Sequence, residues 1–219
     1  MRSGDKLSKS TIMRLPLYYR TINSLYESGE VKTSSDQLGL MVGIDPTQVR
    51  RDLSSIGEFG RAGVGYQIPE ILAVLEKLLG FKSTTEAVLV GVGRLGSALY
   101  RYPGFSNYGL RISGLFDSDP EKIGKTLDGL PVMDVSELET VISKQQLQMG
   151  IITVPSFAAQ GIADTMVSSG IIAIWNFAPV RLNVPKGVMV RDEDLAVGLL
   201  HLSRYLVSLN DNEAENNEG

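Results

Sequence analysis

The hydrophobic positions in the first third of the chain follow a helical period. Apolar residues recur at this spacing across 17–26, after Pro16, and Gly29 predicts the end of this first helix. Two further helix starts are expected, at Ser34 and at Asp45, each a good N-cap residue. The apolar positions assigned to the first two helices are Tyr18, Tyr19, Ile22, Leu25, Tyr26, Leu38, Leu40 and Met41.

The predicted third helix, which opens with Asp45 and Pro46, has two different faces. Val49, Leu53 and Ile56 fall on one stripe and are expected to face inward. The opposite face is polar and basic, and a short helix, a tight turn and such a second helix are typical of helix-turn-helix DNA readers. Arginine can bond guanine O6 and N7, so this helix is the expected base reader. The DNA contacts expected from it are Thr47, Gln48, Arg50, Arg51 and Ser54.

The segment after this helix, Gly57–Tyr66, is too rich in glycine for a helix and alternates like a β-hairpin, which makes it a wing. Arg61 near its tip is expected to enter the minor groove. Ser34, Ser35 and Tyr66 suit phosphate contacts, the serines because free amides at a helix start attract anions. Two alternatives stay open: an ordinary helix bundle with a solvated arginine face, and Tyr66 as the hydrophobic anchor of the hairpin.

Short apolar, β-branched runs alternate with helical segments from Glu86 onward, after a connecting helix expected at 70–79. This alternation predicts a Rossmann-like α/β domain with a doubly wound parallel sheet. The strands are expected at 86–91, 110–116, 130–133, 150–154, 171–177 and 187–190, and the later helices at 135–144 and 156–169. The last helix, 193–209, is more apolar than a surface helix requires, so we expect it to dock on another subunit. His201 is interpreted as one of its packing residues.

A glycine-rich turn follows the first of these strands. It contains Gly91, Gly93 and Gly96 in the pattern GxGxxG, and Asp117 ends the next strand twenty-one residues past Gly96. This is the fingerprint of a dinucleotide-binding βαβ unit. The carboxylate accepts bonds from the ribose hydroxyls and repels a 2′-phosphate, so NAD(H) is expected rather than NADP(H). The cofactor contacts expected from this unit are Gly91, Gly93, Arg94, Leu95, Gly96 and Asp117.

Two later loops lie just beyond the carboxyl ends of strands, where ligands bind in such sheets. We expect Thr153, Val154 and Pro155, and also Asn176, Phe177 and Ala178, to form the floor of the nicotinamide pocket. The open alternative is that the prolines of these loops only stop strands.

Composition narrows the function. The chain has 219 residues, no cysteine and one histidine, which excludes disulfides, thiol redox sensing and a multi-histidine metal cluster, so no metal is expected. No apolar run is long enough to span a bilayer and no secretion signal is visible, so a cytoplasmic protein is expected. The net charge of −4 divides into +2 over residues 1–82 and −6 over 83–219, which places the basic surface on the N-terminal part.

The expected domains follow from these patterns. They are a winged-helix DNA-binding domain at 1–82, a Rossmann NAD(H)-binding domain at 83–191, a dimerisation helix at 192–209 and a disordered tail at 210–219.

The chain resembles the Rex family of bacterial redox-sensing transcriptional repressors across residues 5–209. The segments that carry the resemblance come from both halves of the chain, in the family's order. They are Val49–Ser54, Gly63–Tyr66, Val90–Ser97, Tyr102–Phe105, Phe116–Lys122 and Asn176–Pro179.

The resemblance implies a homodimer that exchanges its C-terminal helices and reads an operator with inverted half-sites. It implies that NADH and NAD⁺ compete for one site and that NADH releases the DNA. It implies that Arg94 lies at the pyrophosphate, that Tyr102 and Asp194 lie near the moving interface, and that Arg20 pairs with Asp194. One departure is Leu195, where some relatives carry an aromatic residue, and this leaves the strength of the NADH response open.

Two other functions compete with a DNA-binding NAD(H) sensor. An NAD-dependent dehydrogenase needs a substrate domain and a proton donor, and residues 83–219 are fully used by the nucleotide fold. A regulator that binds a coenzyme A thioester is disfavoured by Asp117, since coenzyme A carries a 3′-phosphate on its ribose. The sequence therefore predicts a regulator and no enzyme.

Overall fold

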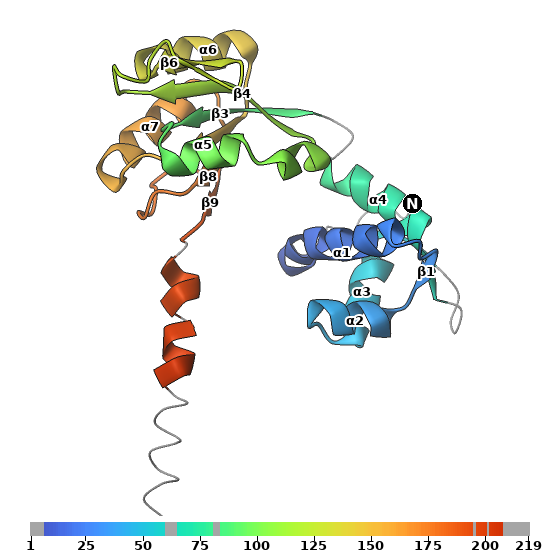
Figure 1. The fold of residues 1–219 in the computed structure, drawn as a ribbon. Coiled ribbons are helices and arrows are strands. Elements are labelled where there is room, and N and C mark those ends of the chain that lie inside the picture. Colours follow the sequence, from blue (N-terminus) through green and yellow to red (C-terminus); the bar gives the residue numbers. More distant parts are fainter. Residues whose placement is uncertain (1–6, 60–64, 81–83, 195, 201, 208–219) are drawn as a thin grey trace, which may run out of the picture. The chain divides into compact units, whose positions relative to one another are not determined.

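The computed structural model describes residues 7–59, 65–80, 84–194, 196–200 and 202–207 (Figure 1). The chain divides into two compact units, Met1–Ser83 and Thr84–Gly219. Arg61, Gly63, Leu195 and His201, which were named above, lie outside the described residues, as does the expected tail 210–219.

The first unit is built around α1 (Lys9–Glu27), which begins well before the expected position. The side chain of Ser8 caps it by accepting a hydrogen bond from the backbone N–H of Thr11 at 3.0 Å. Pro16 lies inside the helix, so our expectation that the helix follows this proline was wrong. The buried stripe continues on both sides of the proline, and this packing outweighs the missing N–H. Its members are Leu15, Tyr18, Tyr19, Ile22 and Leu25.

Two short helices, α2 (Ser35–Val42) and α3 (Pro46–Ile56), follow with a tight turn between them. Gly43 ends α2 in the left-handed region, with φ of 68°. A Cβ atom on Gly39 would lie 2.6 Å from the carbonyl oxygen of Ile44, so the helices approach as closely as a glycine permits. This is the helix-turn-helix arrangement that the sequence predicted.

The buried face of α2 differs from the expected one. Leu38 and Gly39 are buried, but Leu40 is 87% exposed and Met41 is 51% exposed. The expectation that Leu40 and Met41 belong to the packed face of α2 was therefore wrong, and so was that for Tyr26 on α1, which is 51% exposed. Because the close approach to the following turn runs through Gly39, the next two residues point away from the core.

The first unit contains a two-stranded antiparallel sheet. Strand β1 (Lys32–Thr33) pairs with β2 (Tyr66–Gln67), and Thr33 lies opposite Tyr66. This partner of β2 precedes α2, and residues 60–64 of the hairpin expected at Gly57–Tyr66 lie outside the described residues. The Tyr66 side chain packs against the core, and α4 (Ile68–Leu79) closes the unit.

The second unit contains a seven-stranded sheet of order β5-β6-β4-β3-β7-β8-β9 among the described residues. All pairs are parallel except β5 with β6, and β3 is the central strand. The strands are β3 (Thr85–Val90), β4 (Leu110–Asp117), β5 (Thr126–Leu127), β6 (Leu130–Asp134), β7 (Met149–Ile152), β8 (Ala173–Asn176) and β9 (Met189–Asp192). Apart from β5, which the sequence reasoning missed, each lies within two residues of its expected bounds.

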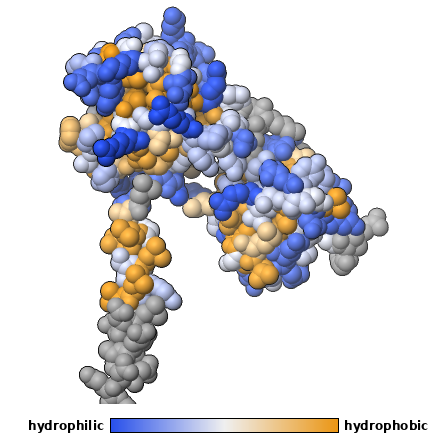
Figure 2. All heavy atoms as spheres, viewed as in Figure 1, coloured by the Kyte–Doolittle hydropathy of each residue, from blue (hydrophilic) through white to orange (hydrophobic). Residues whose placement is uncertain are grey.

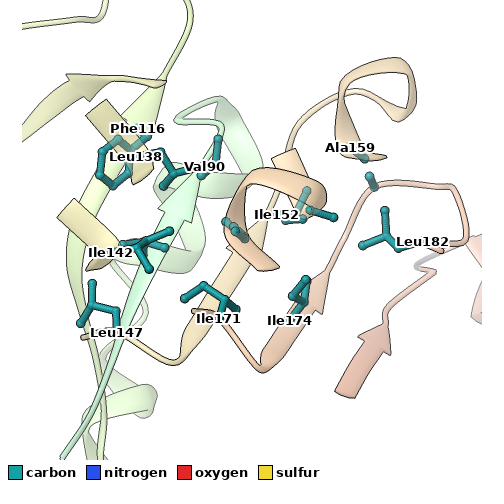
Figure 3. Packing of buried hydrophobic residues seen from close by; sticks show 14 residues of the cluster. Val90, Phe116, Leu138, Ile142, Leu147, Ile152, Ala159, Ile171, Ile174 and Leu182 are labelled. Atoms are coloured by element: carbon teal, nitrogen blue, oxygen red, sulfur yellow. The ribbon is translucent and has the colours of Figure 1, made fainter. Parts of the chain in front are cut away.

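Helices pack on both faces of this sheet, as expected for a doubly wound fold. The helical elements are α5 (Arg94–Tyr100), η1 (Pro103–Tyr108), η2 (Val135–Glu137), α6 (Leu138–Gln145) and α7 (Ser156–Ser168). Side chains of α6 and α7 pack with those of the strands in one buried cluster, where Leu138, Ile142 and Ala159 approach Val90 and Ile152 (Figure 3). The opposite face has its own core, to which α5 contributes.

Residues 196–200 and 202–207 form the C-terminal helical segment, and Asp194 caps it by accepting a hydrogen bond from the N–H of Ala196 at 2.8 Å. This segment carries exposed apolar side chains (Figure 2). They are Val197, Leu199, Leu200, Leu202, Tyr205, Leu206 and Val207. None of the helices in the described residues combines the length and apolar character that a membrane crossing needs.

Candidate nucleotide site and nucleic-acid interface

The glycine turn between β3 and α5 is held by close backbone contacts. Gly91 has φ of 101° and donates its N–H to the carbonyl of Phe116 at 2.8 Å. A Cβ on Gly91 would lie 2.8 Å from the carbonyl of Thr153, and a Cβ on Gly96 would overlap the carbonyl oxygen of Gly91. A Cβ on Gly93 would meet nothing within 4 Å. Gly91 and Gly96 are therefore needed where the turn passes close to other backbone atoms. Gly93, in contrast, leaves the backbone accessible to a ligand.

Asp117 lies at the end of β4, beside this turn, and is buried. Its Oδ2 accepts hydrogen bonds from the backbone N–H of Val92 at 2.7 Å and from Lys122 Nζ at 3.0 Å. Its Oδ1 accepts the N–H of Asp119 at 2.9 Å. Burial alone would raise the pKa of the carboxyl, but these hydrogen bonds outweigh it and hold the pKa below its usual range. Asp117 is thus an ionised group that fixes the turn.

The remaining capacity of this carboxylate suits a ribose. An ionised carboxylate has about four lone-pair positions, and three are used by Val92, Asp119 and Lys122. One position stays available to a hydroxyl donor, and the Lys122 ammonium has further N–H groups for a second hydroxyl. The sequence reasoning missed Lys122. Its place five residues after Asp117 gave no signal without the fold.

The loop after β7 is bound to the glycine turn. The Thr153 hydroxyl donates to the carbonyl of Gly91 at 2.7 Å and its N–H to that of Val90 at 2.9 Å. Val154 is half-buried and Pro155 is exposed. The structure thus brings this loop and the glycine turn together, as a shared ligand floor requires.

The loop after β8 is clamped by Asn176, which is fully buried. Its Nδ2 donates to the carbonyl of Val180 and to Asp192 Oδ1, both at 2.8 Å, and its Oδ1 accepts the N–H of Ala178 at 3.0 Å. The Asn176 amide is therefore engaged inside the loop, and Phe177, half-buried beside it, is the side chain better placed for a ligand.

The remaining predicted cofactor and switch residues lie at the edges of these elements. Arg94 is exposed at the start of α5, with Leu95 half-buried behind it. Tyr102 is 54% exposed, and its ring meets that of Phe105 at 4.9 Å. Arg20 lies exposed on α1 of the first unit, whereas Asp194 belongs to the second, so their pairing stays a prediction.

The outer face of α3 carries most of the residues predicted to read bases. Thr47, Arg51 and Ser54 are exposed, and so is Arg50, whose Nη2 donates to Ser35 Oγ at 3.1 Å. The side chain of Gln48, in contrast, is half-buried and points inward, where it donates to Asp52 at 2.9 Å.

Asp52 is a buried carboxylate of α3 that the sequence reasoning did not single out. It accepts hydrogen bonds from Arg14 Nε at 2.6 Å, the Tyr18 hydroxyl at 2.7 Å and the Thr11 hydroxyl at 3.1 Å, all on α1. Burial raises its pKa, but the bonds from Arg14, Tyr18 and Gln48 outweigh this and hold the pKa at about 2. This charge fixes α3 against α1.

The residues predicted to contact phosphate have different surroundings in the structure. The Ser34 hydroxyl caps α2 by accepting the N–H of Gln37 at 3.1 Å, and Ser35 is buried beneath Arg50. Tyr66 packs its ring on the core, as the hydrophobic-anchor alternative expects, while remaining partly exposed. No group of His, Asp or Glu side chains able to hold a metal ion occurs in the described part of the chain.

Known proteins match both units. Residues 6–54 match the family model "Putative DNA-binding protein N-terminus", and residues 82–180 match "CoA binding domain". The redox-sensing transcriptional repressor Rex of Roseiflexus sp. (strain RS-1) is 41% identical over 94% of this chain and 93% of its own length. The chain belongs to the Rex family. The Rex repressor of Desulfitobacterium hafniense is 46% identical over 89% of this chain and 92% of its own.

Solved structures of a Rex-family repressor named RSP agree with this family assignment. RSP in complex with β-NAD⁺ and operator DNA has a TM-score of 0.88 and 33% identity, covering 99% of this chain and all of RSP. RSP in complex with β-NADH has a TM-score of 0.86 and 32% identity over the same shares. The predicted fold class, a winged helix-turn-helix domain with a Rossmann-like parallel sheet, is confirmed.

Proposed function

We propose that this chain is a redox-sensing transcriptional repressor that binds operator DNA as a homodimer and is released when NADH occupies its second unit. The observation that carries the proposal is the pairing of a helix-turn-helix with a glycine turn and an ionised Asp117 in one chain. The relatives that are named Rex repressors, and the RSP complexes with NAD⁺, NADH and operator DNA, support it.

The nucleotide, NADH or NAD⁺, would lie across the carboxyl ends of the central strands. Gly93 would approach the pyrophosphate, with Arg94 above it, and Asp117 with Lys122 would bind the adenosine ribose. The loops after β7 and β8 would floor the nicotinamide, chiefly through Thr153 and Phe177. Neutral reduced nicotinamide enters an apolar pocket at lower cost than the charged oxidised ring, which favours NADH as the effector.

The operator would be read by the exposed face of α3. Arg51 and Arg50 would contact base edges, with Thr47 and Ser54 beside them, and helix α2 would meet the phosphates near Ser34. Two such heads in a symmetric dimer require an inverted repeat. Since these contacts displace counterions, operator affinity should fall steeply as salt rises.

Homodimer formation is assigned to the C-terminal helical segment, whose exposed apolar side chains need a partner surface. In the dimer, Asp194 at the start of this segment would pair with Arg20 of a head and Tyr102 would lie near the moving interface. A ligand changes DNA affinity only by binding the two dimer states differently, and this pair would sense the difference.

A regulator that binds a coenzyme A thioester is the second candidate. The match of residues 82–180 to the CoA binding domain favours it. Asp117 argues against it, because an ionised, nearly buried carboxylate repels a phosphate on the ribose.

One experiment separates these functions. Operator DNA would be selected from a random pool by gel shift, and the selected complex would be titrated with NADH, NAD⁺, NADPH and acetyl-CoA. We expect release by NADH at the lowest concentration. No selected operator, or no release by NADH, would overturn the proposal, and release by acetyl-CoA alone would favour the second candidate. Turnover of NADH with carbonyl compounds would indicate an enzyme.

A further inference from the structure

Trp175 on β8 is the one tryptophan of the chain, and it lies in a row of aromatic rings. Its ring centroid is 4.8 Å from that of Phe177 and 5.5 Å from that of Phe105. Phe105 in turn meets Tyr102 edge-on at 4.9 Å. The row therefore runs without a break from the loop after β8 to the start of η1. Aromatic pairs at these spacings attract one another through specific geometry, so one ring limits the positions of the next.

The indole N–H of Trp175 points to a third segment. It donates to Glu193 Oε1 at 3.4 Å, the same oxygen that accepts Arg191 Nε at 2.9 Å. The backbone N–H of Glu193 bonds the carbonyl of Asn176 at 2.8 Å. Glu193 directly precedes Asp194, which caps the C-terminal helical segment. Trp175 thus touches the residue that leads into this segment.

The three neighbours of Trp175 belong to the parts that the proposed function must connect. Phe177 is in the proposed nicotinamide floor, Phe105 leads to Tyr102, which is proposed to lie near the moving interface, and Glu193 adjoins the proposed switch residue Asp194. Packed interiors change between discrete arrangements rather than deforming smoothly. Because Trp175 contacts all three neighbours, its ring provides a physical path by which a shift of one would reach the others.

We propose that Trp175 is a positioning residue that couples nicotinamide binding to the switch residues Tyr102 and Asp194. This inference rests on the proposed function and adds the side chain through which it acts. Trp175 itself touches neither DNA nor the ribose end of the nucleotide site in this role. Its removal should therefore affect the link between the two binding events more than either event.

The test uses the full chain and two variants, Trp175→Leu and Trp175→Phe. The readout is the coupling factor, the ratio of operator Kd values with and without saturating NADH, measured together with the Kd for NADH alone. Residues that connect two sites change such factors by roughly 2- to 30-fold. We expect Trp175→Leu to lower the coupling factor about tenfold while operator affinity without NADH stays within about twofold. Trp175→Phe keeps a ring in the row and should retain most of the coupling.

Phe105→Leu tests the same row from its half-buried neighbour, should Trp175→Leu fail to fold. It should also lower the coupling factor, and the double variant should lose less than the two single losses combined, because both act through one contact. Phe157→Leu is the matched control, an aromatic-to-leucine change at a ring that is 89% exposed, and it should leave the coupling factor unchanged.

Full coupling in folded Trp175→Leu and in Phe105→Leu would overturn the inference and leave the proposed function intact. An equal loss in Phe157→Leu would also overturn it. If the wild-type complex is not released by NADH, the proposed function itself fails, and the inference fails with it.

Discussion

At the scale of single residues, each of the two units contains a buried carboxylate that orders its surroundings. Asp52 and Asp117 both keep their charge in the interior, and both do so because several donors converge on them. Burying an ionised carboxylate without such donors costs several kcal/mol, so each is placed where its donors can reach. Asp52 orders the head, and Asp117 orders the glycine turn.

Asp52→Asn should destabilise the first unit by about 2–3 kcal/mol, because the charge that Arg14 and Tyr18 bond is lost. The pKa of Asp52 is about 2 in the folded chain against 3.8 for a free side chain. Since the folded pKa is lowered, its contribution is full above about pH 4 and is lost as pH falls toward 2, by about 2 kcal/mol. Urea unfolding at pH 7 and pH 3 measures both effects, and the substitution should remove this part of the acid sensitivity.

The matched control is Asp45→Asn at the exposed N-cap of the same helix, where asparagine caps equally well. Its stability should stay within about 0.5 kcal/mol of wild type. Equal losses of stability in the two variants would contradict a specific stabilising role of the hydrogen bonds to buried Asp52.

Asp117→Asn should weaken NADH binding roughly 10- to 100-fold, because charge-assisted bonds to the ribose are worth about 1.5–3 kcal/mol. Asparagine keeps one oxygen for the N–H of Val92, but its NH2 group then faces the N–H of Asp119, so part of the loss reflects a loosened turn. NADPH should lose less than NADH, since the repulsion of a 2′-phosphate is reduced. Calorimetric titration gives both affinities, with Asp164→Asn on α7 as the exposed control. An unchanged NADH-to-NADPH ratio would contradict the role of Asp117 at the ribose.

At the scale of elements, the helix-turn-helix depends on the close approach at Gly39. Gly39→Ala places a methyl 2.6 Å from a backbone oxygen that cannot move alone, so the helices must separate. We expect a loss of about 1–3 kcal/mol in stability and strongly weakened operator binding. Gly161→Ala in α7 is the control: its methyl meets nothing within 4 Å, and it should stabilise by up to about 1 kcal/mol. Thermal melts compare the two, and equal behaviour would contradict the argument.

Much of the arrangement of helices and strands could be predicted from the sequence. Strand positions, the glycine turn and Asp117 could be located because each has a local pattern: an apolar run, a GxGxxG spacing, a carboxylate at a strand end. The head was less predictable. The start of α1 before Pro16, the exposure of Leu40 and the pairing of Tyr66 with Thr33 depend on packing between distant segments.

In the candidate sites, too, features with a local sequence pattern were predictable and contacts between distant segments were not. The sequence located the glycine turn of the proposed nucleotide site and the outer face of α3, because glycine spacing and helical period are local signals. It could not show that Gln48 turns inward to Asp52, that Asn176 is used inside its loop, or that Lys122 reaches Asp117. Such side-chain contacts join elements, and no spacing along the chain encodes them.

At the scale of the whole molecule, the apolar C-terminal segment should decide the assembly. Leu202→Glu with Leu206→Glu should convert the proposed dimer to a monomer, because each leucine that a dimer buries contributes about 1.5–3 kcal/mol and four would be lost per dimer. The monomer should bind its operator far more weakly, since one head reads one half-site. Sedimentation velocity measures the assembly, with Ser203→Glu as the control on the same segment. A double variant that stays dimeric would place the interface elsewhere.

The three glycines of the turn have a consequence for how tolerance to mutation should be interpreted. Positions 91 and 96 have no space for any side chain, so a library screened for abundance alone should already reject every substitution there. Position 93 has space, and the same screen should accept many residues. If substitutions at 93 fail only under selection for repression, that failure would therefore report the bound nucleotide itself. Failure of substitutions at 91 and 96 reports only the backbone packing of the turn.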